Sequence, residues 1–254
     1  MKYKIIFSDI DGTLINSHHF VSDKTKATLM KMKIPVILVS ARMPEGIRSI
    51  QNQFANADPI ICYSGALVLN GQEVIYDEGI DIPTAKQLYD DLIKEEVSIS
   101  TYCYERWYGH CYDSWIKQEE EITSLKAIIA PFDGEKQVHK ILCMAEPEKI
   151  NDLEQKIKSK YPFLSVYKSK ATYLEIMSGH ISKLKAIEVL LKYYHLTLKD
   201  SVSFGDNYND LDMLEHTGLS FVMANAPEEI KNKIGRVTLS NDEDGVAYAI
   251  ENLI

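Results

Sequence analysis

Two aspartates near the start of the chain, Asp9 and Asp11, have the type and spacing of a pair that could transfer a phosphoryl group. They stand in the segment DIDGT (residues 9–13), directly after the apolar run of residues 3–8. Ligands of open α/β sheets bind beyond the carboxyl ends of the strands, where two such carboxylates can face the same side. One could attack phosphorus and the other could protonate the leaving oxygen, and together they could hold a hard cation such as Mg²⁺.

The alternative for DIDGT is a surface turn with two solvated acids. A calcium-binding EF-hand loop is excluded, because a loop that starts at Asp9 would need glycine in place of Leu14 and glutamate in place of Phe20.

A second acidic segment, GDNYND (residues 205–210), follows another apolar run and precedes an expected helix. Asp206 and Asp210 could complete the metal site, and the N-terminus of the helix would favour a bound anion. The alternative is a helix cap with solvated acids. An EF-hand is excluded here too, because Leu211 stands where that loop requires glycine.

Two further residues could bind phosphate. Ser40 opens the segment Ser40-Ala41-Arg42 after a third apolar run, and its hydroxyl could donate to a phosphate oxygen, although an N-cap role would also explain it. Lys183 begins a helix that Ser182 can cap, and it offers a point charge. The alternative for a lone lysine is a solvated surface position.

The elements that must position these residues fall into two patterns. Short apolar runs alternate with helical patterns at both ends of the chain, which predicts βαβ units and a parallel sheet with helices on both faces. The middle of the chain mixes helices with alternating strands, which favours an α+β unit. We therefore expect a Rossmann-like, three-layer α/β core from residues 1–79 and 181–254, and an inserted α+β cap domain from residues 80–180. The expected helices cover residues 22–33, 84–95, 148–161, 183–194 and 211–216, and the expected strands cover residues 3–8, 34–39, 59–63, 99–104, 107–112, 139–144, 172–177, 201–204 and 219–223.

Composition limits the partners. The 254 residues carry a net charge of −9, which argues against non-specific attraction to nucleic acid or anionic lipid. The apolar runs are far shorter than the roughly 20 residues that span a bilayer. The N-terminus does not read as a signal peptide, and the four cysteines read as free, buried thiols, so we expect a cytoplasmic protein.

Together and in this order, the four segments resemble the four motifs of the haloacid dehalogenase (HAD) superfamily. The stretch between the second and third motifs resembles the class IIB cap of the Cof-type phosphatases, and residues 219–226 and 244–246 resemble further Cof-type segments. The resemblance thus covers essentially the whole chain. It implies an Mg²⁺-dependent phosphatase that acts on a small phosphorylated metabolite, such as a sugar phosphate or a phosphorylated cofactor, as a monomer or small homo-oligomer.

The resemblance also implies roles for single residues. Asp9 would be the nucleophile, forming an aspartyl-phosphate, and a metal ligand. Asp11 would be the general acid/base, with its backbone carbonyl on the metal. Asp206 would be the third protein ligand, and Asp210 would support the metal site from behind it or near Lys183. Ser40, Lys183 and Asn209 would bind the phosphoryl group.

Gly12, Arg42 and Ser64 complete the expected phosphate and substrate site, and two departures from the family pattern bear on it. The chain has Ser64-Gly65 where the family often has Asn-Gly, which leaves one polar substrate contact open. It has Ser40-Ala41-Arg42 where the family often has Thr-Gly-Arg, which keeps the hydroxyl. Arg42 could reach substrate or cap, or form a structural ion pair.

The expected cap contains an aromatic run at residues 102–112. It could form a specificity wall, but β propensity favours a hairpin that packs the cap's own sheet. His110 and His180 are further possible substrate contacts. Two other functions stay open: a phosphotransferase of the phosphomannomutase type, which should carry basic residues in a cap whose only arginine is Arg106, and a non-catalytic protein that binds a phosphorylated metabolite.

Overall fold

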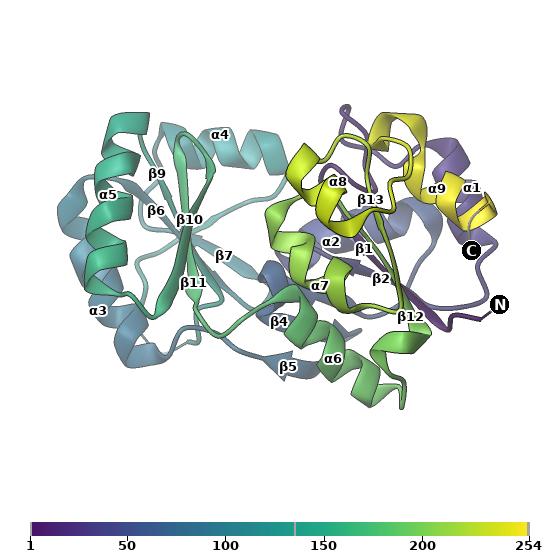
Figure 1. The fold of residues 1–254 in the computed structure, drawn as a ribbon. Coiled ribbons are helices and arrows are strands. Elements are labelled where there is room, and N and C mark those ends of the chain that lie inside the picture. Colours follow the sequence, from purple (N-terminus) through teal and green to yellow (C-terminus); the bar gives the residue numbers. More distant parts are fainter. Residues whose placement is uncertain (1, 135, 253–254) are drawn as a thin grey trace. The chain divides into compact units, whose positions relative to one another are not determined.

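The chain forms two compact units, which are coloured along the sequence in Figure 1. The computed structural model describes residues 2–134 and 136–252. The first unit comprises Met1–Tyr76 and Ser182–Ile254, and the second comprises Asp77–Ile181. The first unit is therefore assembled from both ends of the sequence.

The first unit is built on a seven-stranded sheet. Its strands, in spatial order, are β13 (Leu219–Val222), β12 (Ser201–Gly205), β1 (Ile5–Asp9), β2 (Val36–Val39), β3 (Ile60–Cys62), β4 (Leu67–Asn70) and β5 (Glu73–Asp77). The strands from β13 to β3 are parallel, as the βαβ pattern predicts. β4 runs antiparallel to β3, and the two strands β4 and β5 were not expected.

Helices cover both faces of this sheet. They are α1 (Asp23–Met30), α2 (Pro44–Gln51), α6 (Lys183–Tyr193), α7 (Leu211–His216), α8 (Glu228–Ile234) and α9 (Gly245–Asn252). Apolar residues of α6, α7 and α8 pack against one face, where Phe7 and Ile37 are fully buried. Right-handed crossovers place α1 and α2 on the opposite face, and α9 lies beside α1 (Figure 1). This is the three-layer α/β core that the sequence predicts.

Two serine caps begin their helices where the sequence predicts. The Ser22 hydroxyl accepts a hydrogen bond from the Thr25 N–H at 3.1 Å, and the Ser182 hydroxyl accepts one from the Lys185 N–H at 3.1 Å. α1 ends at Met30, three residues before the expected position.

The second unit contains a six-stranded sheet packed against two helices. Its strands, in spatial order, are β10 (Leu164–Lys170), β11 (Tyr173–Ser178), β9 (Lys140–Met144), β6 (Ser98–Cys103), β7 (Arg106–Gly109) and β8 (Ile128–Ile129). Neighbouring strands are antiparallel except for β7 and β8. Helices α3 (Ile82–Leu92) and α5 (Pro147–Lys160) bury their apolar faces against the sheet. Helix α4 (Ser114–Thr123) and strands β8 and β10 were not expected.

The aromatic run forms the predicted hairpin of β6 and β7. Tyr102 and Trp107 face each other across the two strands, both are buried, and their rings stack with centroids 5.9 Å apart. The interpretation as hairpin packing is therefore confirmed for these two residues.

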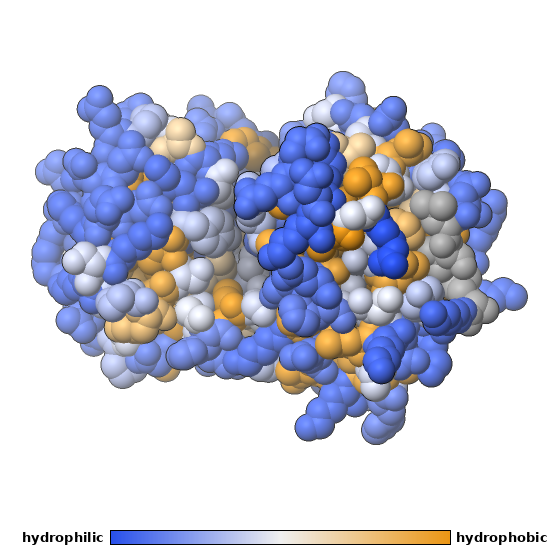
Figure 2. Space-filling model, in the orientation of Figure 1, coloured by the Kyte–Doolittle hydropathy of each residue, from blue (hydrophilic) through white to orange (hydrophobic). Residues whose placement is uncertain are grey.

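The exposed surface and the cysteine side chains are two further features of the protein. The face shown in Figure 2 is mainly hydrophilic, with hydrophobic residues in small scattered groups. Within residues 2–134 and 136–252, no helix is long and apolar enough to cross a membrane. The four cysteines are free thiols, but Cys111 is exposed, so the expectation that all four are buried is wrong.

Candidate active site

The predicted site residues gather at the carboxyl edge of the first unit's sheet. β1 lies between β12 and β2, and all three run parallel. Asp9 is the last residue of β1, Ser40 follows β2, and Asp206 follows β12. Because parallel strands end at the same edge, the three side chains meet there, although they are far apart in sequence.

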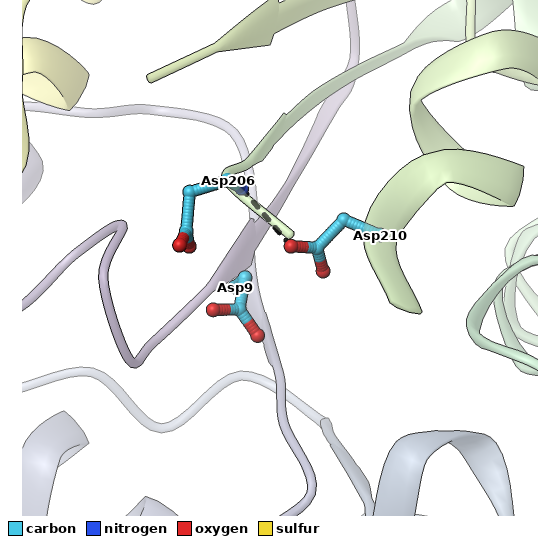
Figure 3. A group of neighbouring side chains, drawn as sticks. All are labelled: Asp9, Asp206 and Asp210. Atoms are coloured by element: carbon cyan, nitrogen blue, oxygen red, sulfur yellow. Dashed lines mark hydrogen bonds between the residues drawn. The ribbon is translucent and has the colours of Figure 1, made fainter. Parts of the chain in front are cut away.

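Three carboxylates form the centre of the site. Asp9, Asp206 and Asp210 each offer one oxygen, and these oxygens all lie within 4.8 Å of one another. Figure 3 shows the three side chains converging from β1 and from the segment after β12. Asp210 is fully buried and Asp9 is 6 % exposed. Of the alternative interpretation of GDNYND, the cap is confirmed, because the Asp210 carboxylate forms a capping box with Asn207, but the expectation of a solvated acid is wrong for Asp210.

The loop after β1 packs closely against Asp206. The Thr13 hydroxyl donates a hydrogen bond to Asp206 Oδ1 at 2.7 Å. Gly12 has φ +82°, and a Cβ at this position would lie 2.4 Å from Asp206 Oδ2. Glycine is thus needed here both for the backbone conformation and for the approach to the carboxylate.

Backbone N–H groups fix the position of the Asp210 carboxylate. Its Oδ2 accepts hydrogen bonds from the N–H groups of Asp206 at 3.0 Å and Asn207 at 2.9 Å. A Cβ on Gly205 would lie 2.5 Å from the Cβ of Asp210, so the strand end and the turn are in direct contact. Asp210 therefore fixes the segment that carries Asp206.

Lys183 places its ammonium between two of the carboxylates. The residue is 1 % exposed, and Nζ lies 2.5 Å from Asp9 Oδ1 and 2.5 Å from Asp210 Oδ1. Burial disfavours the charged form, but the two carboxylates outweigh it and raise the pKa of Lys183 above its usual value. The alternative of a solvated surface lysine is therefore wrong.

The acids carry more negative charge than Lys183 neutralises. Burial, and then the charge of Asp210, raise the pKa of Asp9 well above its usual range, although Lys183 lowers it. Burial raises the pKa of Asp206 to about 6, against the hydrogen bond from Thr13. Burial is the main cause of both shifts, because it disfavours the charged carboxylate, and the charge of Asp210 adds to it.

Asp11 lies apart from this cluster and pairs with Arg42. The Arg42 Nε donates to Asp11 Oδ2 at 2.8 Å, and Nη2 donates to Asp11 Oδ1 at 2.6 Å. Burial opposes the Arg42 charge, but Asp11 outweighs it and raises the pKa of Arg42. Of the two interpretations of Arg42, the structure shows the ion pair.

Ser40 and Ser64 are neighbours in the site. Ser40 is buried, and its hydroxyl accepts from the Arg42 N–H at 3.2 Å; the N-cap of α2 is Met43, so the alternative of a capping serine is wrong. The Ser64 N–H donates to the Ser40 carbonyl at 2.9 Å. The Ser64 hydroxyl is buried without a hydrogen-bond partner in the described part of the chain.

The three remaining candidate substrate contacts, Asn209, His110 and His180, have different surroundings. Asn209 is exposed in the 3₁₀ turn Tyr208–Asp210. In the second unit, His110 Nδ1 pairs with the Tyr89 hydroxyl at 2.6 Å, whereas His180 is exposed.

Two asparagines that sequence reasoning missed secure the loop after β1. Asn225 Nδ2 donates to the Gly12 carbonyl at 2.8 Å, and Asn225 Oδ1 accepts from the Asn241 N–H at 3.0 Å. Asn241 Nδ2 in turn donates to the Ile15 carbonyl at 2.9 Å. Asn225 follows an expected strand and lies within residues 219–226, which resemble a Cof-type segment, and both features were available signals.

Comparisons with known proteins agree with this geometry. The chain matches the family of haloacid dehalogenase-like hydrolases over residues 6–250. A Haemophilus influenzae protein named "Putative phosphatase" is 36 % identical over 99 % of this chain and 98 % of its own length. The crystal structure of a haloacid dehalogenase-like hydrolase from Bacteroides thetaiotaomicron is 28 % identical, with a TM-score of 0.92 over 100 % of both chains.

A further solved structure, of a HAD subclass IIB sugar phosphatase, shares the fold with a TM-score of 0.81 at 23 % identity, over 98 % of both chains. The match to the family extends across both units of the chain. The chain therefore belongs to the haloacid dehalogenase-like hydrolases.

Proposed function

We propose that this enzyme hydrolyses small phosphomonoesters with the help of Mg²⁺, through an aspartyl-phosphate on Asp9. The observation that carries the proposal is the cluster of Asp9, Asp206 and Asp210, in which the buried ammonium of Lys183 contacts Asp9 and Asp210. A nucleophile, a cation for phosphate and an acidic cradle for a metal thus lie at one sheet edge.

The donor set fits Mg²⁺. All three side chains offer oxygen atoms, which this hard cation prefers, and they leave room for the water ligands that it usually keeps. Because three carboxylates face one ammonium, a divalent cation would balance the remaining formal charge at the site. Asp9 and Asp206 would hold the ion directly, Asp210 would support it, and the ion would neutralise charge on the phosphoryl oxygens.

The reaction then has two steps, and each side chain has a defined role in them. A carboxylate oxygen of Asp9 forms a bond to phosphorus while the ester oxygen departs, and Asp11 gives that oxygen a proton. In the second step Asp11 takes a proton from water, the water oxygen attacks phosphorus, and the bond to Asp9 breaks to release phosphate. Lys183 and the Ser40 hydroxyl bind the phosphoryl oxygens in both steps.

Small phosphorylated metabolites, such as sugar phosphates or phosphorylated cofactors, are the proposed substrates. The similar fold of a sugar phosphatase supports the first class. A phosphotransferase would need to grip a second phosphate, and residues 77–181 contain the single arginine Arg106. Release of inorganic phosphate without a bisphosphate activator would separate the two activities.

The test is a phosphate-release screen over common phosphorylated metabolites. We expect release with Mg²⁺, none with EDTA, and none from an Asp9→Asn variant. Asp23→Asn, at an exposed position on α1, is the matched control and should keep full activity. Turnover by Asp9→Asn would refute the proposed nucleophile, and binding of esters without any turnover would favour the non-catalytic alternative.

A further inference from the structure

We propose that Arg42 is a positioning residue, which holds the Asp11 carboxylate in the orientation that proton transfer requires, and that it is not a ligand of the substrate phosphate. This inference rests on the proposed function, because it presumes that Asp11 exchanges protons with the leaving group and with water.

The geometry of the pair is directional. Both oxygens of Asp11 accept from Arg42, at 2.8 Å from Nε and 2.6 Å from Nη2. A planar guanidinium that donates two parallel hydrogen bonds fixes both the position and the rotation of a carboxylate. A lysine would supply the charge without this orientation.

Arg42 is itself anchored by the residues around it. Its N–H donates to the Ser40 hydroxyl at 3.2 Å, and its carbonyl accepts from the Tyr63 N–H at 3.2 Å. The guanidinium thus projects from backbone that is tied to both neighbouring strand ends, β2 and β3. Asp11, in contrast, sits on the loop after β1, so the ion pair joins two separate loops of the site.

Asp11 needs such a partner because the metal cluster does not supply one. In the described part of the chain, the carboxylates that converge are those of Asp9, Asp206 and Asp210. Lys183 is committed to Asp9 and Asp210. Arg42 is therefore the cation that sets the direction of the Asp11 carboxylate.

The pair contributes little to the stability of the fold. The side chains of Arg42 and Asp11 are 31 % and 51 % exposed, and ion pairs as exposed as this one stabilise a fold only weakly. A large kinetic effect of an Arg42 variant would therefore reflect the site and not unfolding.

Leaving groups of different basicity test the inference. An alkoxide must be protonated as it departs, whereas p-nitrophenolate leaves without a proton. We expect Arg42→Gln to lower kcat/KM about 100-fold for glycerol phosphate, within the range of general acid catalysis, and several-fold at most for p-nitrophenyl phosphate. Arg42→Lys should show the same selective loss. The ratio kcat/KM is the right quantity because it reports the steps up to departure of the leaving group.

Inorganic phosphate, used as a competitive inhibitor, separates positioning from binding. Its inhibition constant should be unchanged in both variants, and Arg48→Gln, a substitution on α2, should match the wild type throughout. Equal losses for both substrates, no loss, or weaker inhibition by phosphate would overturn the inference. Failure of the proposed function would look different, since the wild type would then release no phosphate or Asp9→Asn would stay active.

Discussion

Lys183 and Asp9 form a buried ion pair between residues 174 positions apart in the sequence. The same ammonium contacts Asp210, so one cation joins β1 to the segment after β12. Because these groups are buried, removing the cation leaves two carboxylates close together without a counter-charge.

We expect Lys183→Met to destabilise the metal-free protein by about 3–5 kcal/mol, the usual cost of breaking a buried ion pair on one side. Urea unfolding in the presence of EDTA measures this loss of stability. Phosphate release should also fall, because the variant lacks the cation that binds the phosphoryl oxygens. Lys185→Met, two residues away on the same helix, is the control. Similar unfolding midpoints for the two variants would contradict the structural role of Lys183.

Mg²⁺ affinity should depend on pH in a defined direction. Protons and the metal compete for the same oxygens, and the pKa of Asp206 is raised to about 6 while that of Asp9 is also raised. We expect affinity to be highest above the pKa of Asp206 and to fall about tenfold per pH unit, for each proton displaced, below it. Titration calorimetry across this range is the measurement, and affinity that does not change with pH would count against direct ligation by Asp206.

The acidic cluster should cost the metal-free protein stability. For an acid whose pKa is raised on folding, the stabilising contribution is present below the unfolded pKa and is lost as the pH rises through the folded pKa, here about 6. In EDTA at pH 8, Asp206→Asn should therefore raise Tm by about 2–4 °C, whereas near pH 4 the two proteins should melt together. The variant should also lose Mg²⁺-dependent stabilisation, and a lower Tm at pH 8 would contradict this account.

Asn225→Ala should loosen the loop after β1 without touching an ionisable group. It removes the hydrogen bonds to the Gly12 carbonyl and from the Asn241 N–H, and because both bonds are exposed to water the expected cost is about 0.5–1.5 kcal/mol. We expect weaker Mg²⁺ binding and slower turnover, measured by activity against Mg²⁺ concentration. Asn252→Ala, which removes a comparable hydrogen bond to the Tyr248 carbonyl on α9, should leave both unchanged.

The convergence of Asp9, Ser40 and Asp206 could be anticipated because strand ends in a parallel sheet share one edge, and short apolar runs show where strands end. The burial of Lys183 could not, since its surroundings come from three distant segments. The sequence also could not predict whether Arg42 would contact the substrate or Asp11, because that depends on how closely the loops after β1 and β2 approach each other.

Some missed elements had a local signal. Asn70-Gly71 is a strong turn dipeptide, and it separates the strands β4 and β5 that were not expected. In contrast, β8 consists of two residues and depends on its neighbour β7, so its own sequence hardly specifies it.

The place of β1 in its sheet has a consequence for biosynthesis. One edge of β1 pairs with β2, which emerges from the ribosome soon afterwards, but the other pairs with β12, whose residues follow the whole second unit. During translation the nascent β1 therefore exposes the unpaired backbone N–H and C=O groups of that edge while Asp77–Ile181 is made and acquires its own core. Such an edge is prone to intermolecular pairing, so a transient chaperone would be most useful to this protein in that interval.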